Sequence, residues 1–158
     1  MTIGEVIAGL RAVGCSQADI DKALRETYAR YQQHFTDETA EEEYGPKVRA
    51  ALAEGQAVPP RQLSTEAWIA YALFVDGKPE SIASVVDTVD ALDRMVPTAD
   101  EVAWAFMRLK QRGWLVVEGA LYGLTAEGRA AIAGIIGRDG DRFDHVKMLR
   151  AWISAHLP

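Results

Sequence analysis

Few residues of this chain have the chemistry of a catalytic or metal-binding group, and their spacing fits no known arrangement. His34, His145 and His156 have no metal-ligand spacing with one another or with Cys15, which is the only cysteine. We expect structural or surface roles for the three histidines and a buried or inert thiol for Cys15.

Three carboxylates, Asp139, Asp141 and Asp144, suggest a calcium-binding loop, since calcium prefers oxygen ligands of this kind. An EF-hand loop needs an acidic residue at its last position, and that position holds Arg150. A polar loop with an Asp cap for the next helix explains the cluster better. The sequence also has no P-loop motif and no Gly-x-Ser-x-Gly motif. We therefore predict no enzymatic activity, no cofactor and no metal site.

The composition is that of a soluble globular protein. The apolar fraction is 49% and the charged fraction is 25%. The net charge of −6 gives no overall attraction to nucleic acid. The first residues include an acidic one and contain no long apolar run, which predicts neither a signal peptide nor a membrane span. The single cysteine does not indicate a compartment, and we take a reduced cytoplasm as the default expectation.

The elements that must position any binding residues centre on residues 97–129. Thr98 followed three residues later by Glu101 is a capping box, which predicts the start of a helix. Apolar residues at helical spacing give this helix one buried face, and Gly113 ends it. We expect Phe106 on that face, and Trp114 just after the helix, to lie in the core.

A β-hairpin should follow this helix. The run from Trp114 to Val117 has the apolar composition of a short strand. Gly119-Ala120 is a two-residue loop that suits a hairpin, and Leu121 begins the return strand. Thr125 then caps another helix.

The rest of the chain is predicted to be helical. In the helix from about 17 to 35, Tyr28, Tyr31 and Phe35 lie on one side; we expect core or subunit contact there, with ligand stacking as the alternative. Gly45-Pro46 should break the chain, and Pro59-Pro60 lies in a linker at 55–62. The other predicted helices cover about 3–13, 47–52, 65–73, 80–95 and 141–157.

The segment LKQRGWLVVEGALYGLTAEGRAAI resembles the end of many bacterial winged helix-turn-helix regulators. In those proteins a recognition helix ends in Leu-x-x-x-Gly-hydrophobic, and the wing returns through Tyr-x-Leu-Thr-x-x-Gly. The resemblance covers residues 64–137, about half the chain, and the flanking helices resemble the dimerisation arms of MarR-type regulators. The N-terminal 60 residues match no family. The matching residues are Leu109, Gly113, Trp114, Tyr122, Leu124, Thr125 and Gly128.

The resemblance implies a mainly α fold: a winged helix-turn-helix of three helices and a short two-stranded wing, with helical extensions at both ends. The expected domains are a helical N-terminal extension (1–62), the winged helix (63–137) and a C-terminal helix (138–158). The apolar sides of helices 17–35 and 141–157 lead us to expect a homodimer. The residues expected to bind DNA or a partner are Arg94, Thr98, Trp104, Met107, Arg108 and Gln111.

Two classes of function are compatible with this fold. The resemblance implies a dimeric DNA-binding transcriptional regulator, which we place first. The alternative is a protein-interaction module, such as an adaptor, an inhibitor or an immunity-type protein, that binds through the same helix face. The alternative is favoured by Asp100 on that face, by Glu118 in the wing, and by residues 64–137, which hold six Lys and Arg against ten Asp and Glu.

Overall fold

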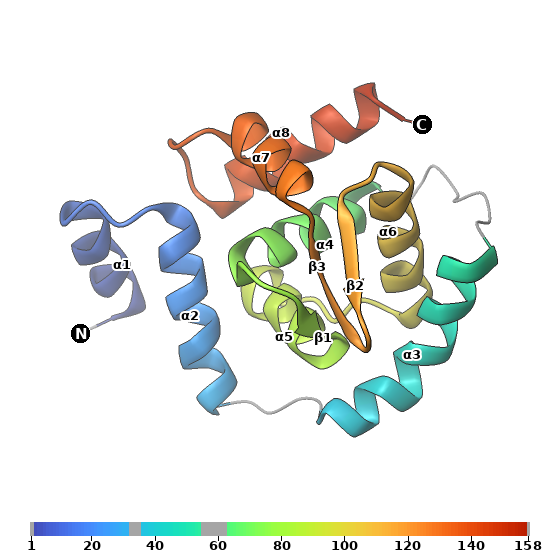
Figure 1. Cartoon of the computed structure of the whole chain (residues 1–158). Helices are drawn as coiled ribbons and strands as arrows, with labels where there is room; N and C mark the ends of the chain where they lie inside the picture. The colour runs from blue at the N-terminus through green and yellow to red at the C-terminus, as the bar shows by residue number, and fades with distance from the viewer. Residues whose placement is uncertain (1, 32–35, 55–62, 158) are drawn as a thin grey trace.

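The computed structural model describes residues 2–31, 36–54 and 63–157, which form a mainly helical protein with one small antiparallel sheet (Figure 1). The elements in chain order are α1 (Ile3–Ala12), α2 (Gln17–Tyr31), α3 (Asp37–Glu54), α4 (Leu63–Asp76), β1 (Glu80–Ser81), α5 (Ile82–Asp93), α6 (Ala99–Gln111), β2 (Leu115–Glu118), β3 (Leu121–Leu124), α7 (Ala126–Ile136) and α8 (Arg142–Ala155).

Helix α4 lies at the centre of the fold. Every side chain described in this helix is buried except that of Phe74, which is half-buried. The helix packs against α2, α5, α6, α7, α8 and the sheet. A helix with apolar residues on every side is expected to be enclosed in this way, because each of its faces gains by leaving water.

The central region follows the sequence prediction closely. Thr98 and Glu101 form the predicted capping box of α6, and Thr125 caps α7. Strands β2 and β3 form the predicted hairpin, with Glu118 opposite Leu121 across the two-residue loop. Gly113 and Gly119 have φ values of +76° and +63°, a conformation in which a side chain is strained.

The sheet has a third strand that the sequence prediction placed in a helix. Glu80 and Ser81 pair with Tyr122 and Leu121, so the strand order is β1-β3-β2. Ser81 is extended, and its side chain accepts a hydrogen bond from the backbone N–H of Ser84 at the start of α5. The helix therefore begins two residues later than predicted, because Ser81 serves as its N-cap.

The predicted break at Gly45-Pro46 is wrong, since α3 runs unbroken from Asp37 to Glu54. An internal proline costs a helix about 3 kcal/mol. Here Ala40, Tyr44 and Val48, spaced four residues apart, are all buried against the rest of the protein. The burial of this stripe offsets the cost of the proline.

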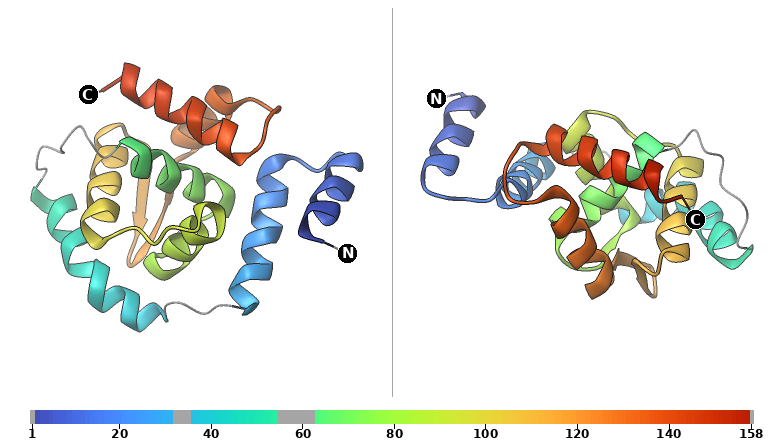
Figure 2. Two further views of the ribbon diagram at one scale, coloured as in Figure 1. Left: turned by 180° about the vertical axis from the view of Figure 1, so that it is seen from behind. Right: turned by 90° about the horizontal axis from the view of Figure 1, so that it is seen from above.

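Both terminal extensions pack onto the central region of the same chain. Helix α2 packs against α4 and α5, and α8 packs against α4 and α7, whereas α1 lies at the periphery beside α2 (Figure 2). On α8, the predicted apolar residues Val146, Leu149 and Ile153 are buried, but Phe143 and Leu157 are exposed. The apolar surface of α8 that suggested a homodimer is therefore largely covered within one chain.

Two sequence predictions fall outside the described structure. Phe35 and the linker at 55–62 are not among the described residues, and the side chains of Tyr28 and Tyr31 are not described either.

The aromatic core supports a stability prediction. Phe106 is fully buried and stacks on Tyr122, with ring centroids 4.7 Å apart. We expect Phe106→Ala to lower the free energy of unfolding by about 3–5 kcal/mol, because removing a buried aromatic ring leaves a cavity. Urea unfolding measures this, with exposed Met148→Ala as the control. Equal midpoints for the two variants would contradict the packing described.

Candidate interaction surface

The structure does not gather the six predicted binding residues on one exposed face. Arg94, Thr98 and Gln111 are exposed, and Trp104 is half-buried. Met107 and Arg108 lie in the interior, with exposed fractions of 2% and 5%. The placement of these two on an exposed binding face is therefore wrong.

Arg108 is buried because it belongs to an ionic cluster beneath α6. Its Nε lies 3.4 Å from Oε2 of Glu66, and Arg112 Nε lies 3.6 Å from Oε1 of the same carboxylate. Burial raises the pKa of Glu66, while the two guanidinium groups of Arg112 and Arg108 act in the opposite direction. A buried carboxylate requires such partners, so both arginines are held inside.

Arg112 also ties the end of α6 to the C-terminal helix. Its guanidinium lies over the rings of Trp114 and Trp152, at 5.7 and 5.5 Å from their centroids. It donates a hydrogen bond to the carbonyl of His156 at 2.6 Å. Arg112 and Arg108 are therefore both held in contacts within the protein, while Arg94 is exposed.

Helix α3 lies along one side of α6 (Figure 1). At the first turn of α6, Lys47 Nζ lies 2.9 Å from Oδ1 of Asp100; in its last turn, Lys110 donates to the carbonyl of Leu52 at 2.7 Å. Ala103 and Met107, between these contacts, are buried. The surface that α6 leaves accessible is a stripe that includes Asp100, Trp104 and Gln111, with exposed Lys110 beside it.

The same helix α3 also reaches the beginnings of α5 and α6. Asp37 accepts a hydrogen bond from the hydroxyl of Ser81, the N-cap of α5, at 2.7 Å. The Tyr44 hydroxyl donates to the carbonyl of Pro97, just before α6, at 2.7 Å, and burial raises the pKa of Tyr44 to about 12. Helix N-termini are places where anions such as phosphate bind. Here a carboxylate of the protein itself lies beside one of them.

The β2–β3 hairpin presents apolar and acidic side chains. Val117 is 45% exposed and Leu121 is 41% exposed, and Glu118 between them is exposed too. From residue 115 to residue 128 the sequence contains no lysine or arginine. Such a hairpin offers nothing positive to a phosphate backbone.

A second polar cluster is buried where α2, α4 and α8 meet. The Tyr71 hydroxyl oxygen lies 2.8 Å from Oδ2 of Asp21 and 3.1 Å from Nδ1 of His145. Gln17 donates to Oδ1 of Asp21 at 2.9 Å, and His145 Nε2 lies 3.0 Å from the carbonyl of Asp139. Asp21, Tyr71 and His145 are all at least 98% buried.

The hydrogen-bond partners in this cluster bear on the charge of Asp21. The carbonyl of Asp139 only accepts, so Nε2 of His145 carries the ring proton. The single proton of the Tyr71 hydroxyl cannot serve both His145 Nδ1 and an ionised Asp21. Burial raises the pKa of Asp21, while the hydrogen bonds from Tyr71 and Gln17 and the guanidinium of Arg142, 3.7 Å from Oδ1, act in the opposite direction.

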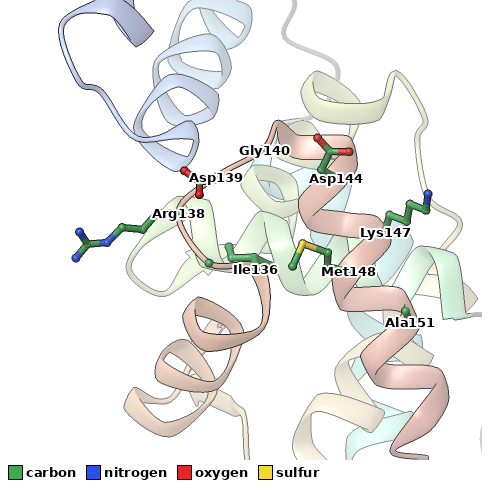
Figure 3. A pocket seen from close by; sticks show the side chains of 9 residues that line it. Ile136, Arg138, Asp139, Gly140, Asp144, Lys147, Met148 and Ala151 are labelled. Carbon is green, nitrogen blue, oxygen red and sulfur yellow. The ribbon is translucent and has the colours of Figure 1, made fainter.

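Among the described hollows, a wide one lies between α7 and α8 and has a volume of about 660 Å³ (Figure 3). Ile136 and Met148 line its floor, while Arg138 and Lys147 point away from it. Its polar groups do not converge on a common point, as they do in a ligand site. Among the described residues, no group of three His, Cys, Asp or Glu side chains could hold a metal ion.

Sequence reasoning missed the buried acids Glu66 and Asp21, although a signal was present. Glu66 lies among apolar residues of α4 and Asp21 follows the apolar Ile20 on α2, and acidic residues that become buried are usually paired. Arg108, the partner of Glu66, and Tyr71, a partner of Asp21, lie 42 and 50 residues away along the chain, so the local pattern does not identify them.

Comparison of the chain with protein-family models, with curated proteins and with solved structures found no match. Within the described residues, no helix has the length and apolar character needed to cross a membrane.

The raised pKa of Asp21 in the α2–α4–α8 cluster leads to a pH-dependent prediction. Protonated Asp21 stabilises the folded state at low pH, and this contribution is lost as the pH rises from the ordinary value of 3.8 through the raised pKa. We expect Asp21→Asn to gain stability relative to the parent protein between pH 4 and pH 8. The reason is that the amide always carries the hydrogen that an ionised carboxylate lacks.

Urea unfolding at the two pH values measures this difference. Glu26→Gln is the matched control, because Glu26 is an exposed acid on the same helix. If Asp21→Asn lost stability relative to the parent protein between pH 4 and pH 8, the prediction would be contradicted.

Proposed function

We propose that residues 63–137 form a winged helix-turn-helix domain and that the protein works as a protein-interaction module. The element order α4-β1-α5-α6-β2-β3 supports the first part, because it is the order of a winged helix, with β1 pairing with β3 and β2 outermost. In this assignment α6 is the recognition helix and the β2–β3 hairpin is the wing.

The observation that carries the second part is the position of α3. A winged helix that reads DNA inserts its recognition helix into the major groove and uses helix N-termini to contact phosphates. Here α3 lies beside α6 from its first turn to its last and contacts the starts of both α5 and α6. Helix α3 therefore occupies space beside α6 that a DNA duplex would need in order to take α6 into its major groove.

Charge supports the same proposal. Asp100 lies on the accessible stripe of α6, and Glu118 lies in the wing. A half-buried Trp104 next to exposed Gln111 is typical of a protein contact, where aromatic side chains dominate the binding energy. DNA affinity depends largely on neutralising phosphates, and both the predicted Arg108 and the nearby Arg112 are engaged inside the protein.

A direct test compares DNA and protein as ligands. We expect no retention of genomic DNA fragments at 50 mM salt, about the lowest concentration at which phosphate contacts are usually compared. A photo-crosslinking amino acid at position 111 should trap a protein partner in cells of the native host. The same amino acid at position 133, exposed on α7, is the control.

DNA binding that falls steeply as salt rises, and that Arg94→Ala weakens, would instead support a DNA-binding regulator. Equal crosslinking at positions 111 and 133 would contradict a specific contact at α6.

A further inference from the structure

Strand β2 is the outer strand of the sheet, and no strand pairs with its other edge among the residues that the structure describes. Residues in an antiparallel pair alternate between those that exchange backbone hydrogen bonds and those that do not. In a hairpin with a two-residue loop, the pair next to the loop is hydrogen-bonded. Glu118 and Leu121 are that pair.

This register fixes which backbone groups of β2 point outward. Counting back from Glu118, Val116 exchanges hydrogen bonds with Gly123, and Trp114 accepts one from Thr125 at 2.8 Å, which agrees with the alternation. The N–H and C=O groups of Leu115 and Val117 therefore point away from β3, toward the outer edge. An extended segment placed along that edge could bond to all four groups.

The side chains around this edge indicate which segment fits. Val117 shares a face of the sheet with Leu115, and Glu118 shares the other face with Val116, because side chains alternate along a strand. Glu118 is the charged residue of the hairpin strands, and Val117 and Leu121 are exposed apolar residues beside it. Directly opposed charges and apolar pairs stabilise neighbouring strands.

We propose that the outer edge of β2 binds an extended segment of a partner protein in which basic and apolar residues alternate. The basic residue pairs with Glu118 on one face, and the apolar residues contact Leu115 and Val117 on the other. This proposal rests on the proposed interaction function and adds the partner's chemistry. The backbone bonds supply the affinity, and Glu118 supplies the preference for a basic segment.

The test uses two synthetic hexapeptides, one of alternating lysine and valine and one of alternating glutamate and valine. Each is titrated into the full chain while the amide signals of the hairpin are followed by NMR. We expect the lysine peptide to shift the amides of Leu115 and Val117, and the glutamate peptide to bind at least several-fold more weakly. Glu118→Lys should reverse this preference by a few fold for each peptide.

Two proline variants separate edge binding from loss of the fold. Val117→Pro removes an outward N–H that β3 does not use, so the hairpin should persist while lysine-peptide affinity falls at least tenfold. Val117→Thr, which keeps the N–H and the branched side chain, should bind like the parent protein. Val116→Pro removes an N–H that bonds to β3 and should disturb the hairpin itself.

Three results would overturn the proposal: no shift of the hairpin amides with the lysine peptide, equal affinity for both peptides, or full binding by Val117→Pro. A fourth such result is a parent protein with a solution mass of twice 17.3 kDa and a Val117→Pro variant that is monomeric. The edge of β2 would then be occupied by a second copy of the chain. None of these depends on the DNA and crosslinking tests. If a partner crosslinks at position 111 but the lysine peptide does not bind, the β2-edge proposal fails and the proposed interaction function stands.

Discussion

The structure depends on the burial of three polar side chains on one enclosed helix. Glu66, Tyr71 and Asp76 are spaced five residues apart on α4, and at about 100° per residue they point in three different directions. A polar group that leaves water must find partners inside the protein. Each of the three therefore contacts a different set of helices. Glu66 contacts α6, Tyr71 contacts α2 and α8, and Asp76 contacts α2 and α5. Asp76 shows how strong the effect of burial is. The guanidinium of Arg25 lies 2.9 Å from Asp76 and lowers its pKa, but burial outweighs this and raises the pKa of Asp76 to about 7.

These anchors explain why the terminal helices are parts of one fold. Through Arg112, Glu66 is connected to the carbonyl of His156 after α8, and through Tyr71 and Asp76 the core is connected to both halves of α2. Apolar residues on α2 and α8 then become buried beside these polar contacts, as Ile20 and Leu149 show. Apolar packing supplies most of the burial, and the polar contacts determine which elements are neighbours.

The sequence predicted what is encoded locally. Capping boxes, glycine stops and the hairpin loop act over three or four residues, so Thr98, Gly113 and Gly119-Ala120 were placed correctly. The sequence could not predict which helix packs on which face, because an amphipathic pattern shows that one side of a helix is buried but not which element buries it. The position of α3 on α6 is the main example, and the wrong break at Gly45-Pro46 has the same origin, since distant contacts outweigh a local signal. Arg108 was misplaced because a long side chain at the margin of the apolar face can turn inward to reach Glu66.

The energetics of α3 indicate whether its position beside α6 is a fixed feature or a removable cover. Lifting α3 would expose Tyr44 and Val48, each of which is at most 1% exposed, and would remove the bond from Tyr44 to Pro97. Exposing a large apolar side chain costs about 1.5–3 kcal/mol, and losing a hydrogen bond costs about 1 kcal/mol. Together these terms reach about 4–7 kcal/mol, which is about a thousandfold or more in an equilibrium constant. A ligand that needed bare α6 would have to supply that difference itself, because a ligand shifts an equilibrium only by its differential affinity. The surface with α3 in place is therefore the one that the folded protein presents.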